Sequence, residues 1–475
     1  MKTTKILLLF VFSFLIFSCS EDKMDEVNME LNDALNVSAQ SMVPDVILKS
    51  AVETTATDIA WYATVYIEHS AGTWAQSADA DKRINQNSAT TFNNSWNNLY
   101  DVMNVCKVII DKTAPGGPDE SNQFARGIAQ LLTAYNLAVT TDMWGEVPWT
   151  EALQGAAILQ PKYDKQSTLY PLIQTYLDDA IISFTAATNI SAVGDYIYAG
   201  DKAKWIKAAY SLKARYYLRL SNVDTSAASK ALTAITNGFG SSADAFMFKA
   251  YAATATGENP WVQFLADRTH LSVSTSFYNL MNTRNDPRID KYFTKIGTAY
   301  VPAPNGTAIL TQGGVYSTSA ITNSTTAGRT LPTPMMTFHE LKFIEAEAKF
   351  RANNATWAAA LQAAVEANFV FNGLTVTQGT AYYTTAVIPR LTAGNELKEI
   401  LTQKYIALYE HEAIEAYNDY RRVPSFLTLA NPNNALVGFV WRFPYSTSEE
   451  QSNSANIPSV NIFTEKVWWA GGTEK

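Results

Sequence analysis

Residues 124–153, FARGIAQLLTAYNLAVTTDMWGEVPWTEAL, predict a long helix that ends in a sharp corner. The first half of this stretch has apolar residues at the i, i+3, i+4 and i+7 spacing of an amphipathic helix: Ile128, Leu131, Leu132, Tyr135 and Val139. Gly145 and Pro148 end this helix, because glycine permits a left-handed backbone and proline disfavours α geometry in the residue before it. Trp144 and Trp149 add a large apolar surface to the corner, so we expect neighbouring helices to cover them.

Amphipathic helical patterns recur on both sides of this corner. Successive helices of this length resemble tetratricopeptide pairs, and Trp96 with Leu99 fits the W-x-x-L part of that signature, although no period of about 34 residues repeats. Asp164 and Asp201 each precede a predicted helix and are candidate N-terminal caps. The sequence therefore predicts a mostly α-helical fold, with helices long enough to cross a domain at 46–70, 94–111, 166–186 and 203–220.

The composition changes between residues 225 and 330, where Gly, Ser, Thr, Asn and Ala dominate. We expect a loop-rich insertion that carries little β structure, with short β-like runs at 299–301 and 308–310. Long loops inside a globular chain often carry function, so we look for the ligand site here. No low-complexity linker divides the chain after its first 41 residues, which favours one helical domain over residues 42–475.

The N-terminal segment has the features of a bacterial lipoprotein signal. Two lysines precede the apolar run 6–17, which is shorter than the roughly 20 residues that span a bilayer. The run ends in Ile-Phe-Ser-Cys, which resembles a lipobox, so we expect lipidation of Cys19 after removal of the signal peptide, residues 1–18. A signal peptide with an incidental cysteine is the alternative. Residues 19–41 begin with an acidic run and are expected to form a lipidated, solvated tether.

The charge and the cysteine content of the chain exclude some classes of partner and of fold. The 44 acidic residues outnumber the 36 Lys and Arg, and the formal net charge is −8. Removal of the signal peptide with its two lysines makes the chain more acidic still, so nucleic acid is a poor partner. Besides Cys19 the chain contains only Cys106, which lies in a helical pattern and is expected in the core. No disulfide framework is therefore possible.

We expect no catalytic activity and name no cofactor and no metal ligand. Glu340, Glu345 and Glu347 offer carboxylates, but a glycosidase needs two of them facing one bond about 5–10 Å apart. Glutamates on helices are more often solvated or paired with Lys and Arg. The segment from His411 to Glu415 lacks the second histidine of a zinc-protease helix. No G-x-S-x-G elbow, P-loop or Rossmann fingerprint stands in a suitable context.

Several motifs resemble those of the SusD/RagB-like outer-membrane lipoproteins of Bacteroidetes. The corner fits the pattern D-x-W-G-x-V-P-[YW]-x-E-A over residues 142–152. Further similar blocks are PKYDKQ at 161–166, NDPR at 285–288 and QKYIAL at 403–408. Tyr210 departs from the family's A-N-S-L-K-L-R block, where asparagine is usual. The blocks follow the family's order over essentially the whole mature chain.

The resemblance implies a single SusD-like domain with tetratricopeptide-like helix pairs, anchored in the cell outer membrane by acylated Cys19 and facing the exterior. It also implies that the protein captures an oligosaccharide and delivers it to a SusC-like TonB-dependent transporter. The acidic run behind Cys19 resembles a tag for display on the outer leaflet. Family members that serve peptide uptake leave a second function open, in which a helical-repeat lipoprotein binds a peptide or protein in an extended groove.

A sugar site needs a flat aromatic platform beside polar groups that satisfy the hydroxyls. Trp74 lies in a polar segment and Trp261 lies at the start of the loop-rich region, both outside helical stripes, so they are the candidate stacking platforms. A loop tryptophan can also fold back onto the core, and that alternative stays open. The candidate polar ligand-binding residues near them are Asp81, Arg83, Asn85, Asn87 and Asn259.

Overall fold

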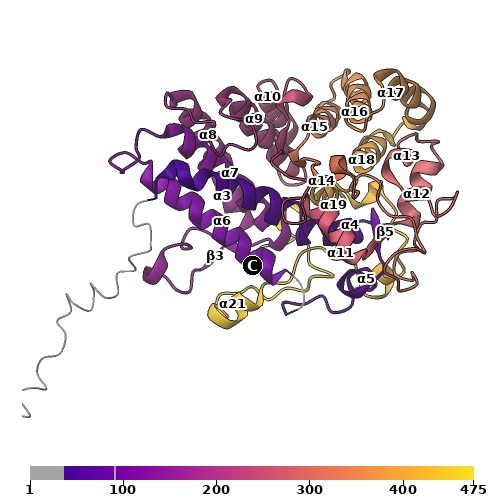
Figure 1. Ribbon diagram of the computed structural model, residues 1–475, viewed down its shortest axis with the longest axis horizontal. Helices are drawn as coiled ribbons and strands as arrows, with labels where there is room; N and C mark the ends of the chain where they lie inside the picture. Colours follow the sequence, from indigo (N-terminus) through magenta and orange to yellow (C-terminus); the bar gives the residue numbers. More distant parts are fainter. Residues whose placement is uncertain (1–36, 90–91) are drawn as a thin grey trace, which may run out of the picture. The chain divides into compact units, whose positions relative to one another are not determined.

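A computed structural model describes residues 37–89 and 92–475 (Figure 1). Cys19, the signal peptide and most of the tether lie outside these residues, so their roles stay predictions. A compact unit begins at Ala39, where helix α3 starts, inside the stretch 19–41 that we expected as tether. Helix makes up 54% and strand 5% of the structure, which confirms the mostly α-helical fold. Within the described residues, no helix has both the length and the apolar character to cross a membrane.

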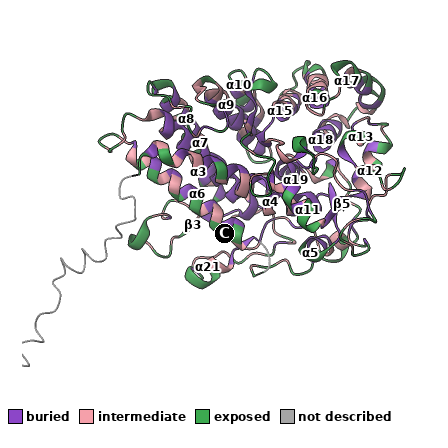
Figure 2. Ribbon diagram, viewed as in Figure 1, coloured by how far each residue is buried: buried purple, intermediate pink, exposed green. Residues whose placement is uncertain are grey.

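Helix α7, Gln123–Trp144, is buried over nearly its whole length, as Figure 2 shows. It packs against α6, Asn93–Lys112, and against α8, Gln166–Ala186. At Gly127 the ring of Phe184 on α8 packs so closely on the backbone of α7 that a Cβ would lie 2.7 Å from it. The helix that we predicted in the stretch 124–153 is therefore confirmed, and so are those at 94–111 and 166–186.

Gly145 ends α7 with a φ of +84°, and the chain turns into the predicted corner. A Cβ at Gly145 would lie 2.6 Å from the guanidinium group of Arg442. The same guanidinium lies 2.8 Å from the carboxylate of Glu146. Trp144 donates from Nε1 to the carbonyl of Pro444 at 2.8 Å. The cover that the corner requires thus comes from the C-terminal segment as well as from the helices beside α7.

A two-residue ladder completes the corner, in which β2, Val147–Pro148, pairs antiparallel with β3, Tyr163–Asp164. Asp164 accepts hydrogen bonds from the backbone N–H groups of Trp149 at 2.8 Å and Thr150 at 2.7 Å. The carboxylate therefore closes the corner, and the cap role that we predicted for it is wrong, because the residue before α8 is Lys165.

Helices that pack in succession follow α8 in the chain (Figure 1): α9, Lys202–Arg219; α10, Ala227–Ile235; α15, Phe338–Arg351; α16, Trp357–Phe371; α17, Val376–Tyr382; α18, Glu396–Ala407; and α19, Ala413–Arg422. α8 packs on α9, α9 on α10, α10 on α15, and α15 on both α16 and α18. Asp201 accepts from the N–H groups of Ala203 and Lys204, so its predicted capping of α9 is confirmed.

Buried ion pairs join these helices. Arg215 on α9 pairs with Glu340 on α15, and Arg422 on α19 lies 2.7 Å from Glu347 on α15. Burial acts to raise the pKa of Glu347, but Arg422 and Arg351 outweigh it and lower this pKa to about 2. The carboxylates of Glu340 and Glu347, which we weighed as catalytic groups, are therefore partners of arginines in the core.

The helix predicted at 46–70 is interrupted in the structure. It consists of α3, Ala39–Lys49, a π-helical segment η2, Ser50–Thr55, and a separate helix α4, Asp58–Tyr66. The hydroxyls of Ser50 and Thr55 each donate to a backbone carbonyl at 2.7 Å. Such side-chain bonds compete with the regular α-helical pattern, which explains why the periodicity alone did not reveal the break.

The region 225–330 is loop-rich, as predicted, but it also contains α11, Pro260–Arg268, α12, Thr275–Asn282, α13, Ile289–Tyr292, and α14, Thr326–Arg329. Its strand β4, Phe246–Phe248, pairs antiparallel with β6, Thr333–Met336, and β5, Leu271–Val273, pairs antiparallel with β1, Ser70–Gly72. The runs at 299–301 and 308–310 are not strands: within them only Ala299 forms a bridge, an isolated one to Ile296. The remaining short elements are α5, Ala75–Lys82; η3, Gly155–Ala157; η4, Ser242–Asp244; η5, Tyr383–Val387; η6, Ile388–Arg390; η7, Pro424–Phe426; α20, Asn433–Leu436; α21, Thr447–Ser452; and η8, Trp468–Ala470.

Candidate functional site

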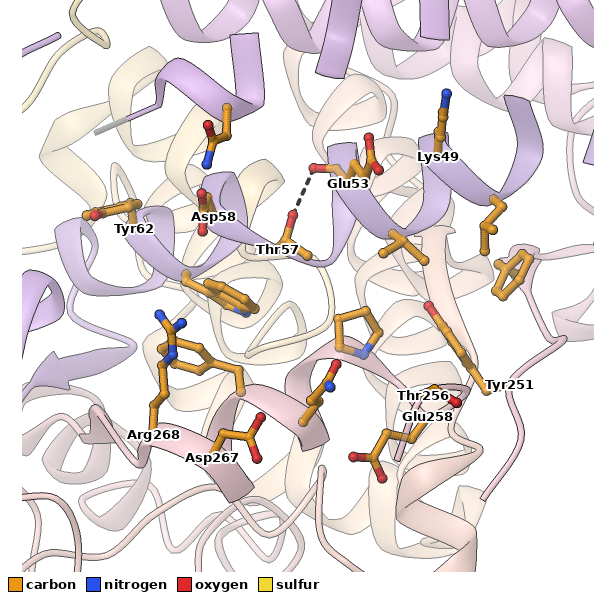
Figure 3. Close-up of a pocket in the computed structure, with 18 of the residues that line it drawn as sticks. Lys49, Glu53, Thr57, Asp58, Tyr62, Tyr251, Thr256, Glu258, Asp267 and Arg268 are labelled. Carbon is orange, nitrogen blue, oxygen red and sulfur yellow. Dashed lines mark hydrogen bonds between the residues drawn. The ribbon is translucent and has the colours of Figure 1, made fainter. Parts of the chain in front are cut away.

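A cavity of about 1080 Å³ opens between the N-terminal helices and the loop-rich region (Figure 3). Residues of η2 and α4 form one wall, and the segment from β4 to α11 forms the wall that faces it. Residues at the start of α6 also line it. The break between η2 and α4 lies in the first wall, where Thr57, Asp58 and Trp61 line the cavity.

Aromatic side chains from both walls meet in this cavity. The indole of Trp61 on α4 stacks on the ring of Phe264 on α11, with centroids 4.0 Å apart and planes 21° from parallel. Nε1 of Trp61 is buried and has no hydrogen-bond partner in the described part of the chain. Exposed edges and faces of such rings are the surfaces on which the C–H face of a sugar stacks. The other aromatic lining residues are Tyr62, Phe92, Phe248 and Tyr251.

Most of the charged side chains that line the cavity are acidic: Asp45, Glu53, Asp58, Glu258 and Asp267, against Lys49 and Arg268. Nζ of Lys49 lies 2.5 Å from Asp101 and 3.3 Å from Asp45. Glu258 lies 3.1 Å from Arg329, which is not part of the lining. Burial raises the pKa of Asp58 although the nearby Arg268 opposes this shift, and burial likewise raises the pKa of Glu53 against the field of Lys49.

Trp74, the first predicted platform, is the residue before α5 and is 37% exposed. It does not line the cavity of about 1080 Å³, although Gln76, two positions further on, does. Trp74 therefore lies at the surface near the cavity without contributing to its wall, and the structure does not test its predicted role in stacking.

Trp261, the second predicted platform, lies in a helix and not in a loop, so that structural expectation is wrong. It is the second residue of α11 and is only 6% exposed. Asn259 caps this helix by accepting from the N–H of Trp261 at 2.9 Å, and its amide donates to the carbonyl of Leu331 at 2.8 Å. The structure thus matches the alternative in which the tryptophan packs onto the core, and its ring lies nearly perpendicular to that of Trp61.

The polar residues predicted around Trp74 serve mainly the local fold. Asp81 is buried and accepts from the N–H of Gly306 at 2.6 Å and from the amide of Asn305 at 2.9 Å. Burial raises the pKa of Asp81 to about 7. Arg83 is also buried and donates to the side chain of Asn434 at 2.9 Å. Asp81 and Arg83 therefore hold two distant loops against α5, and do not line the cavity.

Asn85 and Asn87 follow α5 and make local contacts. The amide of Asn85 donates to Asp79 at 2.8 Å, and the side-chain oxygen of Asn87 accepts from the N–H of Ala89 at 3.0 Å. Neither residue lines the cavity, so the structure does not bring the predicted polar set together around one aromatic platform.

Sequence reasoning missed Trp61, because this residue lay inside the continuous helix that we predicted at 46–70. An aromatic residue in such a stripe is ordinarily assigned to the core. Thr57 and Asp58, just ahead of a new apolar pattern, are the residue types that start a helix. That signal would have placed Trp61 in the first turn of a separate helix, next to an irregular segment.

The family of the chain follows from a comparison with models of known protein families. Residues 32–445 match the model of SusD-like proteins described as "Starch-binding associating with outer membrane". The chain belongs to the SusD-like family. The resemblance seen in the sequence motifs is thereby confirmed, and the family's description places its members at the outer membrane.

Solved structures show the same fold as this SusD-like protein. A SusD/RagB family protein from Bacteroides thetaiotaomicron is 34% identical, with a TM-score of 0.84 over 92% of this chain and 100% of that one. A chitin-binding SusD homologue from Flavobacterium johnsoniae is 19% identical, with a TM-score of 0.74 over 90% of this chain and 98% of that one. A comparison with curated proteins gave no match.

This protein belongs to a family of nutrient- and glycan-binding proteins, which are not enzymes. Its buried helical carboxylates agree with that assignment, since Glu340 and Glu347 are held by arginines. Among the described residues, no group of three or more His, Cys, Asp or Glu side chains is placed to hold a metal ion.

Proposed function

We propose that this protein is a surface lipoprotein that binds an oligosaccharide and delivers it to a SusC-like TonB-dependent transporter for import. The observation that carries the binding step is the cavity of about 1080 Å³ in which Trp61 stacks on Phe264. The description of the family as starch-binding supports a carbohydrate ligand, and the chitin-binding proteins among the similar structures support it further.

The cavity supplies both kinds of contact that a sugar needs. Trp61 offers an aromatic surface for a C–H face, and amide or hydroxyl groups for the sugar hydroxyls line the same space. The volume lies at the upper end of the roughly 300–1,000 Å³ that is typical of small-molecule sites, which suits an oligosaccharide better than a single sugar. The neutral polar lining residues are Thr57, Gln76, Asn93, Asn94, Thr256 and Gln263.

The proposed anchoring rests on the sequence. Acylation of Cys19 would fix the protein to the outer membrane, and the acidic residues behind it would direct display on the exterior. Delivery to a transporter rests on membership of the SusD-like family, whose description associates it with the outer membrane.

Binding is tested with a panel of oligosaccharides and the purified mature protein, alongside Trp61→Ala and Trp74→Ala. We expect Trp61→Ala to weaken binding by at least about 1 kcal/mol, the scale of an aromatic contact, while Trp74→Ala binds normally. Asn94→Ala, at an exposed lining position, provides a second variant if Trp61→Ala lowers the melting temperature.

The outcomes of that experiment separate the candidate functions. Loss of binding only in Trp74→Ala would move the site to the surface that we predicted from the sequence. Binding of peptides and of no glycan would favour the function in peptide uptake. Delivery is tested separately by gentle detergent extraction of native membranes, which should recover this protein together with a large outer-membrane β-barrel. Recovery of the lipoprotein alone across several detergents would contradict a stable complex.

A further inference from the structure

The acidic residues of the cavity are not balanced by its basic residues. Lys49 is engaged by Asp45 and by Asp101 outside the cavity, so it contributes no free positive charge. Glu258 is paired with Arg329. Three lining carboxylates take no part in these ion pairs, those of Glu53, Asp58 and Asp267. Among the basic lining residues, only Arg268 takes no part in them.

These three carboxylates have no fixed partner. Within the described residues, the carboxylates of Glu53, Asp58 and Asp267 accept no hydrogen bond and form no ion pair within 4.0 Å. The hydroxyl of Thr57 donates to the backbone carbonyl of Glu53 at 2.9 Å and leaves its carboxylate free. Figure 3 shows Glu53 and Asp58 on one wall and Asp267 on the facing wall, beside Arg268. Glu53 and Asp58 are only partly exposed. Negative charge therefore lies on both sides of the space into which a ligand would enter.

Unpaired carboxylates on the walls of a cavity favour a ligand that brings positive charge. A carboxylate accepts hydrogen bonds and cannot donate them, whereas an ammonium group has three donors and no acceptor. Bonds between the two are charge-assisted and stronger than those between a carboxylate and a neutral hydroxyl. Cavities lined by one sign of charge also concentrate ligands of the opposite sign. An anionic glycan would meet repulsion from both walls.

We propose that this cavity selects a 2-amino-2-deoxy glycan, an oligosaccharide whose sugars carry protonated primary amines, over neutral and acidic glycans. This selectivity rests on the proposed function. The sugar ring stacks at Trp61, and its ammonium groups reach Glu53, Asp58 and Asp267. The site itself is defined by the cavity, by its aromatic lining and by the buried, unpartnered Nε1 of Trp61, and the carboxylates decide the charge of the ligand.

A basic peptide also carries ammonium groups, but the walls suit a sugar better. Peptides that bind as extended strands need a free backbone edge for hydrogen bonding. Here helices provide most of the lining, namely α3, η2, α4, α5, α6 and α11, and helices use their backbone N–H and C=O groups internally. Their contribution to the cavity is therefore side chains, among them the aromatic rings on which a sugar stacks.

The test uses isothermal titration calorimetry with the mature protein and two probes of equal length, a β-1,4-linked glucosamine oligomer and its fully N-acetylated form. At mildly acidic pH the first is cationic and the second is neutral. We expect the amine form to bind about tenfold more tightly, the scale of one or two charge-assisted bonds. The ratio should shrink as salt rises, because exposed charges are screened.

The variant Glu53→Gln/Asp267→Asn should bring the two probes to nearly equal affinity without loss of the N-acetylated probe. Glu450→Gln on α21 removes one negative charge outside the cavity and should leave the preference intact. Equal binding of both probes by the wild type, or tighter binding of the neutral one, would overturn the inference but leave the proposed function standing. Binding of a lysine-rich peptide and of neither probe would overturn both.

Discussion

The indole of Trp61 stacks on the ring of Phe264 with centroids 4.0 Å apart, which joins α4 to α11 across more than two hundred residues of sequence. Trp261, on the same helix as Phe264, meets the indole edge to face at 6.4 Å. The three rings fix the distance between the two walls of the cavity. The proposed stacking platform, Trp61, is therefore part of a contact between two helices.

Trp261 and Trp74 should respond differently to truncation. Trp261→Ala removes a buried ring and should lower the free energy of unfolding by roughly 3–5 kcal/mol, because it leaves a cavity in the core. Trp74→Ala, at a partly exposed position, should change it by no more than about 0.5 kcal/mol. Denaturant unfolding of both variants measures the contrast, and similar values for the two would contradict the assigned burial.

The contact between Gly145 and Arg442 gives a second prediction. Gly145→Ala adds a methyl group that would lie 2.6 Å from the guanidinium, and it also strains a residue with φ of +84°. Gly155→Ala is the matched control, because Gly155 also has a positive φ but has open space around its Cβ. We expect Gly145→Ala to lose more stability, by at least about 1 kcal/mol. Equal losses in thermal unfolding would mean that Arg442 moves aside freely.

Much of the fold was predictable because its signals are local. The periodicity of apolar residues located α7 and α8, and the capping role of Asp201 followed from its place before a helix. The break between η2 and α4 was missed because side-chain hydroxyls interrupt the helix without any glycine or proline. Local signals therefore predict regular helices well and irregular helices poorly.

The site was less predictable, because it depends on which distant segments meet. Trp261 followed Asn259 and Pro260, a cap and a first-turn proline that mark a helix start, yet the surrounding polar composition favoured a loop. Asp81 lay near Trp74 in sequence, but its hydrogen bonds go to Asn305, Gly306 and other residues far along the chain. Only the folded structure shows that Trp61 and Phe264 share a cavity.

Stability should depend on pH through Glu410. This carboxyl group is buried beside the hydroxyl of Thr322, and burial raises its pKa to about 7. In the unfolded chain it titrates near its ordinary value of about 4.3, so between the two values the folded state holds a proton that the unfolded state has lost. The contribution of Glu410 to stability is therefore full below about pH 4 and is lost as the pH rises towards 7.

The glutamine side chain in the variant Glu410→Gln cannot titrate, so this variant is compared with the wild type. Its free energy of unfolding, relative to that of the wild type, should rise by roughly 1–3 kcal/mol between about pH 5 and about pH 8. Chemical denaturation at these two pH values measures the change. A difference between variant and wild type that is the same at both would show that Glu410 does not titrate in this range.

Anchoring is predicted to depend on one side chain. Cys19→Ala should move the protein from the membrane fraction to the soluble fraction, because the predicted tether carries no other apolar anchor once the lipid is absent. Metabolic labelling with a fatty acid provides the direct readout. Incorporation of label into the Cys19→Ala protein would contradict the assignment.

We place the ligand in the cavity between α4 and α11. A crystal structure of the protein with the oligosaccharide that it binds most tightly shows whether a sugar lies there. We predict a sugar ring within about 4 Å of the Trp61 indole, the distance of van der Waals contact, with its polar groups directed at the lining residues. A sugar bound at Trp74, or in the second cavity of about 260 Å³ beside Phe371 and His411, with the first cavity unoccupied, would contradict it.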